Sequence, residues 1–306
     1  MRIHSGVLAA LVTLGSLAAC RQAATPPQPA VRGAELLLRL DDVGMNHAVN
    51  LAIKRVAATG IPFSVSVLFA CPWYQEAVTI LKQNPQISVG VHLALNSEWR
   101  DYRWGPVLGA AAVPSLVDSN GYFFHTGAAL RARNPSLDEV ERELTAQVDR
   151  ALRSGLRIDY VDHHMGTAAS TPELRAIVER IAAKYKLGIS PYFGEADIDL
   201  FAVPPDKKTD SLTAQMRSLD AKRPTVAVIH VAEDTPDMRA LFDMNYAPMN
   251  TPAGEPLTWV HRKAELEMLL SPEFTRALRE TGTKLITYND VIRMKGLQSM
   301  KRPGTD

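Results

Sequence analysis

The chain has 306 residues, of which 46% are hydrophobic and 22% are charged, as in a globular protein with a large core. The formal net charge is only +1, so the sequence lacks a basic field and we expect no nucleic-acid partner. Neither a Gly-rich phosphate-binding loop nor a GxSxG nucleophile elbow occurs, which removes the signatures of dinucleotide enzymes, P-loop NTPases and α/β-hydrolases.

The N-terminus has the pattern of a targeting segment. Arg2 precedes an apolar run over residues 7–19, which has the length of a signal peptide. Leu17-Ala18-Ala19-Cys20 is typical of a bacterial lipoprotein signal, so we expect residues 1–19 to be removed and Cys20 to be lipidated. The alternative is a plain secretory signal cut near Ala19. Lipidation would anchor the chain to a membrane of the bacterial cell envelope, facing the periplasm or the exterior, through a flexible Pro-rich tether over residues 20–33.

Strands and helices alternate along the rest of the sequence. Seven strands alternating with helices predict a parallel α/β fold. Residues 34–296 contain no internal linker, which favours a single (β/α) barrel, seven- or eight-stranded and distorted, over a doubly wound open sheet. Residues 297–306 are predicted to be a loose tail. The predicted strands are 36–40, 63–69, 87–93, 158–162, 187–190, 225–231 and 284–288, and the predicted helices are 46–59, 74–82, 137–153, 171–185, 210–220, 259–270 and 272–281.

Polar residues stand where several of these strands end. Asp41 and Asp42 end the first strand, His92 lies near the end of the third, and Asp162-His163-His164 and His230 end two later ones. The carboxyl ends of parallel strands are where barrel enzymes place their chemistry. One carboxylate and two imidazoles would form a divalent-metal site with open positions, leaving a carboxylate and a histidine as general base and acid. Taken singly, each residue also has a structural interpretation, as a helix cap or a hydrogen-bonded core histidine.

Five short motifs, in order, resemble those of the YdjC-like carbohydrate deacetylases, a family related to the polysaccharide deacetylases. The resemblance covers nearly all of residues 36–291. The motifs are Leu38-Arg39-Leu40-Asp41-Asp42-Val43-Gly44 followed by Asn50-Leu51-Ala52-Ile53, then Gly90-Val91-His92-Leu93, Asp162-His163-His164, Ile229-His230 and Thr287-Tyr288-Asn289-Asp290-Val291.

The resemblance implies a fold, a site and a reaction. Asp42, His92 and His164 would hold one divalent metal ion, with Zn²⁺ or Mg²⁺ expected. Asp41 would be the general base and His230 the general acid. The fold would be the polysaccharide-deacetylase-like barrel, and the reaction would remove N-acetyl groups from a carbohydrate. Asp162 or His163 is expected to orient His164.

The sequence departs from the family pattern within these motifs. Arg39-Leu40 stands where Asn-Ala is usual, and Val43 replaces Phe. His163 stands where Ser is usual, and Met165-Gly166-Thr167 follows where a histidine-rich run is typical. Since these changes lie in the expected pocket, a small chito-oligosaccharide is not assured as the substrate.

A long irregular segment over residues 96–127 is expected to roof the site. Its aromatic residues Trp99, Tyr102 and Trp104 either stack on a sugar or pack the segment onto the barrel, and the sequence leaves both open. Two other functions also stay open. One is hydrolysis of another amide, an ester or a phosphoester on the same metal, and the other is glycan binding by a non-catalytic lipoprotein. The sequence does not indicate the oligomeric state.

Overall fold

A computed structural model of the chain describes residues 33–304. The predicted signal peptide, Cys20 and nearly all of the predicted tether lie outside the described residues. Within the described part, no helix is both long and apolar enough to cross a membrane.

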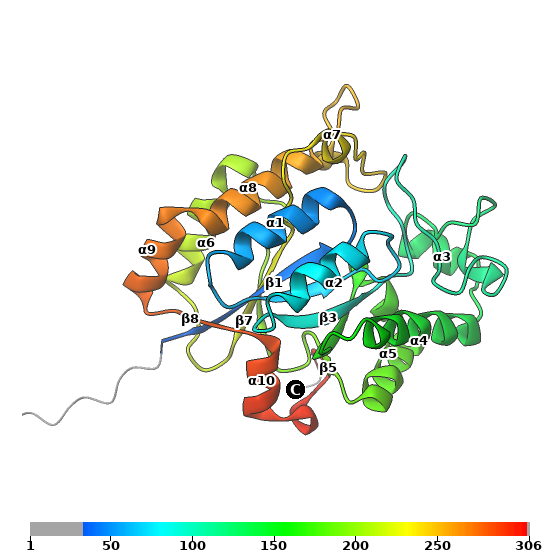
Figure 1. The fold of residues 1–306 in the computed structure, drawn as a ribbon, viewed down its shortest axis with the longest axis horizontal. Helices are drawn as coiled ribbons and strands as arrows, with labels where there is room; N and C mark the ends of the chain where they lie inside the picture. The colour runs from blue at the N-terminus through cyan, green and yellow to red at the C-terminus, as the bar shows by residue number, and fades with distance from the viewer. Residues whose placement is uncertain (1–32, 305–306) are drawn as a thin grey trace, which may run out of the picture. The chain divides into compact units, whose positions relative to one another are not determined.

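The centre of the fold is an eight-stranded, all-parallel sheet (Figure 1). Its strand β1 pairs with three other strands. One edge of β1 pairs with β7, and the other pairs with β8 over residues 35–37 and with β2 over residues 39–43. The strands are β1 (Glu35–Val43), β2 (Ser64–Val67), β3 (Ser88–Leu93), β4 (Tyr160–His163), β5 (Gly188–Ile189), β6 (Ala196–Ile198), β7 (Thr225–Ile229) and β8 (Lys284–Ile286).

The remaining strands follow in the order β5-β4-β3-β2-β1-β7-β6, so β5 and β6 are the two ends of the described sheet. The sheet is therefore a curled barrel that stays open on one side. This confirms the predicted α/β fold with a distorted parallel barrel.

Ten α-helices connect and cover the strands of the described chain, and sequence signals start several of them. The Asn46 side chain accepts the Val49 backbone N–H at 3.0 Å and caps α1, and Thr287 with Asp290 forms a capping box on α10. Figure 1 shows α1 and α2 lying across the strands. The helices are α1 (His47–Ala57), α2 (Tyr74–Lys82), α3 (Gly127–Ala132), α4 (Leu137–Arg153), α5 (Pro172–Tyr185), α6 (Lys208–Met216), α7 (Pro236–Arg239), α8 (Thr258–Leu270), α9 (Pro272–Thr281) and α10 (Tyr288–Lys295).

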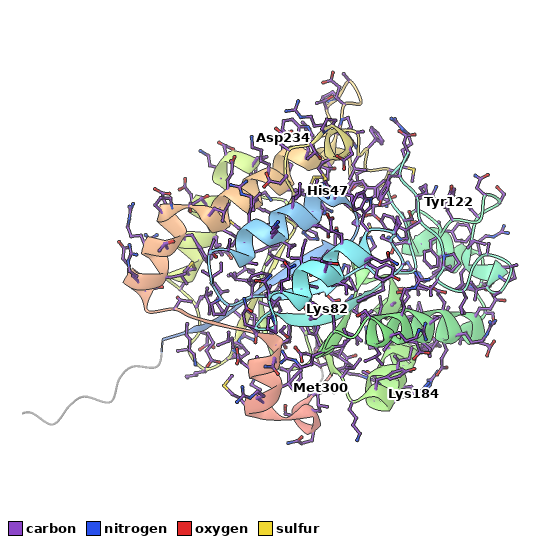
Figure 2. The ribbon with its side chains drawn as sticks, viewed as in Figure 1. His47, Lys82, Tyr122, Lys184, Asp234 and Met300 are labelled. Carbon is purple, nitrogen blue, oxygen red and sulfur yellow. The ribbon has the colours of Figure 1, made fainter. Side chains whose placement is uncertain are left out.

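Part of the predicted loose tail, residues 297–302, contacts the fold. Met300 packs against the hydrophobic core and lies beside α10 (Figure 2). The Lys301 backbone N–H donates to the Tyr192 carbonyl at 2.8 Å, and Arg302 forms an ion pair with Glu179 at 2.5 Å. One apolar side chain and these two polar contacts hold residues 300–302 on the fold.

The packing around Gly90 leaves no space for a side chain at this position. Gly90 on β3 lies opposite Tyr160 on β4, and the fully buried phenol donates its O–H to the Val65 carbonyl at 2.9 Å. A β-carbon at Gly90 would come within 2.4 Å of the Tyr160 ring. The ring thus fills the space that any other residue at position 90 needs.

We therefore predict that Gly90→Ala lowers the free energy of unfolding by about 3 kcal/mol, because the ring must be displaced from a packed core. Gly60→Ala is the control: its β-carbon would meet nothing within 4 Å, so it costs only the strain of a left-handed backbone, about 1 kcal/mol. Chemical denaturation measures both variants. A loss at Gly90 no larger than that at Gly60 would contradict the packing described here.

Candidate metal centre

Asp41 and Asp42 both face one cavity because β1 is irregular where it ends. Successive side chains of a regular strand point to opposite faces, so adjacent aspartates would normally diverge. The register of β1 against β2 shifts between Leu40 and Val43, and Asp42 takes a left-handed backbone with φ of 62°. An irregularity of this kind re-aims side chains. As a result both carboxylates line the same cavity of about 460 Å³.

Each of these buried carboxylates has its own guanidinium. Arg39 donates from Nε and Nη2 to the two oxygens of Asp41, both at 2.8 Å. Arg262 of α8 donates from Nη2 to Asp42 Oδ2 at 2.5 Å. Both aspartates are almost fully buried, where an uncompensated charge would be very costly. The two arginines are therefore what allows two adjacent carboxylates to be buried together.

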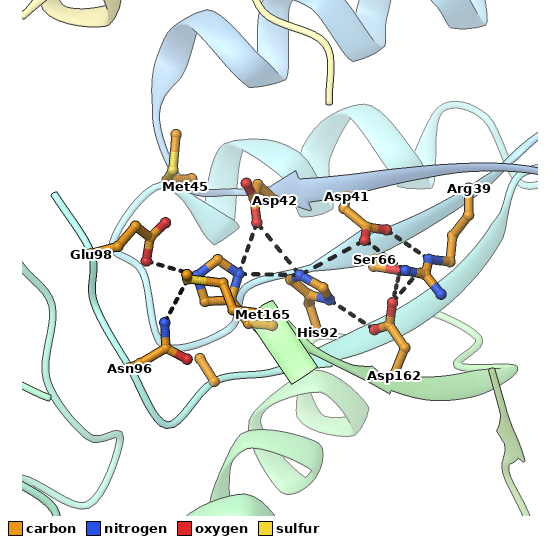
Figure 3. A network of polar contacts seen from close by, with 12 residues as sticks. Arg39, Asp41, Asp42, Met45, Ser66, His92, Asn96, Glu98, Asp162 and Met165 are labelled. Atoms are coloured by element: carbon orange, nitrogen blue, oxygen red, sulfur yellow. Dashed lines mark hydrogen bonds and ion pairs between the residues drawn. The ribbon is translucent and has the colours of Figure 1, made fainter. Parts of the chain in front are cut away.

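Two histidines face the remaining oxygen of Asp42 (Figure 3). Asp42 Oδ1 lies 3.5 Å from His92 Nε2 and 3.1 Å from His164 Nδ1, and the two ring nitrogens are 3.3 Å apart. The other nitrogen of each ring is held by a carboxylate: His92 Nδ1 lies 2.9 Å from Asp162 Oδ1, and His164 Nε2 lies 2.8 Å from Glu98 Oε2. These carboxylates accept the outer N–H groups, so the lone pair of each ring points inward when the ring is neutral.

The three inward atoms fit a divalent cation. Metal–ligand bonds of about 2.1 Å in a tetrahedral site place ligand atoms about 3.4 Å apart, close to the separations observed here. The buried Asp42 Oδ1 has no well-formed hydrogen bond from the described residues, and its nearest polar neighbours are the two imidazole nitrogens, so a cation that replaces their protons can bind to it. One carboxylate and two imidazoles suit Zn²⁺, and a hard cation such as Mg²⁺ would add water ligands. The donor set of Asp42, His92 and His164 is thus suited to the predicted ion.

A second group with metal-ligand chemistry is already occupied by a side chain. Asp41, His92 and Asp162 also lie within reach of one another. However, Arg39 lies between the two carboxylates, with its Nε 3.1 Å from Asp162 Oδ2, and its Nη1 donates to Ser190 Oγ at 2.7 Å. The guanidinium supplies the positive charge there, so this second group does not resemble a cation site.

The charges of the site strongly shift its pKa values. Burial opposes protonation of His164, but Glu98 and Asp42 outweigh it and raise the pKa of that imidazole to about 9. Burial likewise opposes protonation of His92, whose pKa Asp162 and Asp41 raise well above its ordinary value. Burial favours a neutral Asp42, yet Arg262 and His164 hold the pKa of that carboxyl well below its usual range. Protons therefore compete with a metal for both imidazoles.

His230 lines the same cavity from the end of β7. Its backbone N–H donates to Glu265 Oε2 at 2.5 Å, while Glu265 Oε1 accepts from the fully buried Lys208 Nζ at 2.6 Å. Burial lowers the pKa of His230; Asp42 opposes this shift and Arg262 adds to it. A lowered pKa makes the imidazolium form a stronger proton donor.

The five residues predicted to bind the metal or to act as base and acid all line one cavity: Asp41, Asp42, His92, His164 and His230. The expected support of His164 by Asp162 or His163 was wrong, because Asp162 contacts His92 and Glu98 contacts His164. Glu98 is placed by an antiparallel bridge between Trp99 and Asp243. Neither Glu98 nor Arg262 lies at a strand end, so the strand-end pattern did not reveal them.

The aromatic residues of the irregular segment mainly pack it onto the fold. Trp99 and Trp104 are each only 3% exposed, and Trp104 does not line the cavity. Trp99 does border the cavity, and its ring lies 5.5 Å from the Arg262 guanidinium carbon. Tyr102 is partly buried and donates to the Met45 carbonyl. Packing is therefore the better interpretation of Trp104, and Trp99 positions Arg262.

Comparison with known proteins assigns the chain to a family. The model for YdjC-like proteins matches residues 35–280, so the chain belongs to the YdjC-like family. A relative from Geobacillus stearothermophilus named carbohydrate deacetylase is 27% identical over 263 residues, covering 84% of this chain and 98% of that protein. Another of the same name from Vibrio campbellii is 25% identical over 276 residues, covering 87% and 100%.

A solved structure from Enterococcus faecalis V583, described as a candidate cellobiose-phosphate cleavage protein, has the same fold. It aligns with a TM-score of 0.68 at 23% identity, covering 85% of this chain and 99% of that one. The family resemblance predicted from the motifs is thereby confirmed.

The contact between Glu98 and His164 gives a prediction. Glu98→Ala should weaken Zn²⁺ binding about 10- to 100-fold, because the ring loses the carboxylate that orients it. Calorimetric titration measures the affinity. Glu76→Ala is a matched control, since Glu76 contacts His47 Nδ1 at the same distance of 2.8 Å (His47 is labelled in Figure 2), and His47 does not line the cavity. Equal effects of the two changes would argue against the proposed orientation.

The raised pKa values predict a pH dependence of metal uptake. His164, with a pKa of about 9, is protonated at neutral pH and must lose that proton to bind a metal. Affinity should therefore rise as the pH rises toward that value, by about tenfold per unit for each proton released. Titrations between about pH 6 and pH 8, in buffers of different ionisation enthalpy, give affinity and proton count together. An affinity that is flat over this range would contradict the electrostatics described here.

Proposed function

We propose that this protein is a metal-dependent hydrolase that removes N-acetyl groups from a carbohydrate. The main support is one cavity that combines three groups. These are a cation seat, formed by Asp42 Oδ1, His92 Nε2 and His164 Nδ1, an additional carboxylate and an additional imidazole. Membership of the YdjC-like family supports it, as do two relatives named carbohydrate deacetylase that match nearly their full lengths. The proposed cation is Zn²⁺ or Mg²⁺.

Asp42, His92 and His164 would hold the ion. A divalent cation at this seat supplies Lewis acidity, which polarises an amide carbonyl and makes water a better nucleophile. Arg262 keeps Asp42 Oδ2 engaged, so that Oδ1 remains free to face the two rings. Asp162 and Glu98 hold the two imidazoles in the orientation that directs their lone pairs inward.

Asp41 is the proposed general base. Its carboxylate lines the cavity, and Oδ2 lies 4.0 Å from His92 Nε2, beside the seat. The two hydrogen bonds from Arg39 fix the plane of this carboxylate and balance its charge. A positioned carboxylate next to the seat can take a proton from the attacking water.

His230 is the proposed general acid. A departing amine must gain a proton, and His230 is an imidazole that lines the cavity without belonging to the proposed ligand set, so it can deliver one. The bond from its backbone N–H to Glu265 holds the end of β7 in place and so sets the position of the imidazole.

We also propose that the protein is lipid-anchored in the bacterial cell envelope through Cys20. The support is the sequence Leu17-Ala18-Ala19-Cys20 after an apolar run, followed by a Pro-rich tether. An anchor of this kind would bring the enzyme to N-acetylated sugars of the envelope or to imported ones.

Asp41→Asn provides the test. The variant should lose about 10²- to 10⁴-fold in the rate of acetate release from N-acetylated sugars, because the base is removed, while it still binds metal. The panel should contain N-acetyl monosaccharides, chito-oligosaccharides and muropeptides. Chelation should abolish the parent activity, and adding back metal should restore it.

The matched control is Asp234→Asn. Asp234 accepts two hydrogen bonds from Arg239, just as Asp41 does from Arg39, but it lies on the surface. This control should leave acetate release unchanged. Acetate release that survives both Asp41→Asn and chelation would overturn the proposal.

A further inference from the structure

Two large apolar side chains are left exposed at the rim of the catalytic cavity. Met165 is 50% exposed and Phe201 is 41% exposed, and both line the cavity that contains the cation seat. The three seat residues are at most 4% exposed. The cavity is therefore polar and buried at its base and apolar and open at its mouth. Exposed apolar groups around a concave polar site are typical of ligand contact.

Met165 is held at the rim by an unfavourable backbone. It follows His164 directly and has φ of 49° and ψ of 24°, a left-handed conformation that costs about 1 kcal/mol or more for a residue with a β-carbon. Gly166 continues the turn with φ of 71°, and no atom would obstruct a side chain there. The Met165 sulfur contacts Asn96 Nδ2 at 2.9 Å (Figure 3). The strained backbone of Met165 keeps an apolar side chain exposed, and neither feature stabilises the fold, which indicates a functional role.

Phe201 is held at the rim by different contacts. It lies just after β6, where its backbone N–H donates to Asp199 Oδ1 at 2.8 Å. Its ring packs on Tyr246 with centroids 5.0 Å apart, and it lies 6.1 Å from the ring of His230. These contacts place the ring next to the proposed acid, while the residue as a whole stays 41% exposed.

The two side chains come from opposite flanks of the sheet. Met165 follows β4 and Phe201 follows β6, and β3, β2, β1 and β7 lie between those strands in the sheet. The strands that carry Asp42, His92 and His230, which are β1, β3 and β7, therefore lie between the two strands that the apolar groups follow. Because the sheet curls, both groups line one cavity.

We infer that Met165 and Phe201 form an apolar clamp for the C–H-rich face of the pyranose ring that carries the acyl group. This inference rests on the proposed function and adds how the sugar is recognised. The acyl group enters the buried polar base, so the ring that bears it lies at the half-exposed mouth. Asp199 and Asp243 also line the cavity and offer carboxylates to the ring's hydroxyl groups. An apolar face flanked by hydrogen-bond acceptors matches a sugar ring, which is apolar on its faces and polar at its edge.

The test combines ligand binding with thermal stability. The zinc-loaded Asp41→Asn protein is titrated with N,N′-diacetylchitobiose and with any other panel sugar that the parent hydrolyses. Adding Phe201→Ala or Met165→Gly should weaken binding about tenfold each, the loss expected for one apolar contact. Phe201→Trp should retain binding. Met294→Ala removes an equally exposed methionine on α10 and should have no effect.

Met165→Gly has a second expected result that a structural role would not produce. Glycine adopts the left-handed backbone freely, so the melting temperature should stay the same or rise by a few degrees while the affinity falls. In the parent background, KM should rise about tenfold and kcat should stay within about twofold. A melting temperature that falls together with the affinity would assign Met165 to structure and overturn its part in the clamp.

The outcomes separate the clamp from the proposed function. Unchanged affinity in both Phe201→Ala and Met165→Gly, with a parent that binds sugar, would overturn the clamp and leave deacetylation standing. Sugar binding that both variants weaken, with no acetate released by the metal-loaded parent, would overturn the proposed function and support the clamp. No binding of any panel sugar would overturn the clamp.

Discussion

The fold depends on the burial of two adjacent carboxylates at the end of β1, the strand that pairs with three others. Asp41 and Asp42 are each at most 2% exposed, a placement that is prohibitive for bare charges. Three features make it possible: an irregular end to β1, a guanidinium on each carboxylate, and two imidazoles facing the free oxygen of Asp42. Asp42 also has a left-handed backbone, so part of the folding free energy is spent on this geometry. The cation seat is a product of these compensations.

The compensating groups come from distant parts of the sequence. Arg262 lies 220 positions after Asp42, and Glu98 reaches His164 across 66. The parallel sheet explains how they converge, because the ends of β1, β3, β4 and β7 meet at one rim and the following segments fold over it. The segment around Glu98 is tied to Asp243, so two irregular segments close the cavity together. Removing any one charge would leave its partner buried and uncompensated.

Much of this was predictable from the sequence, because polar residues that end consecutive parallel strands must meet. That reasoning located Asp41, Asp42, His92, His164 and His230. It could not locate Arg262, which lies within a helix, or Glu98, which lies in an irregular segment, since neither position has a periodic signal. It also assigned Asp162 or His163 to His164, whereas Asp162 contacts His92, because hydrogen-bond pairing depends on side-chain direction. The strand β6 was missed because Ala196-Asp197-Ile198 lies between Glu195 and Asp199 and contains no apolar run.

The residues that contact the substrate in our proposal were also not predictable from the sequence. Trp99 and Trp104 stand out in the sequence, but both are buried by packing, and only Trp99 borders the cavity. Phe201 and Met165, which do not stand out, remain exposed at the cavity. Exposure is decided by the tertiary structure, and composition alone does not reveal it.

In the proposed reaction, water cleaves an N-acetyl group at this cavity with the help of a metal. The most direct measurement is mass spectrometry of the products formed in heavy-oxygen water by the metal-loaded protein acting on an N-acetylated sugar. The proposed hydrolysis yields acetate that contains one heavy oxygen and a sugar with a free amine and no heavy oxygen, and chelation should abolish both products. Heavy oxygen in the sugar or in a released phosphate, or an unchanged panel of sugars with the metal bound at the seat, would contradict it.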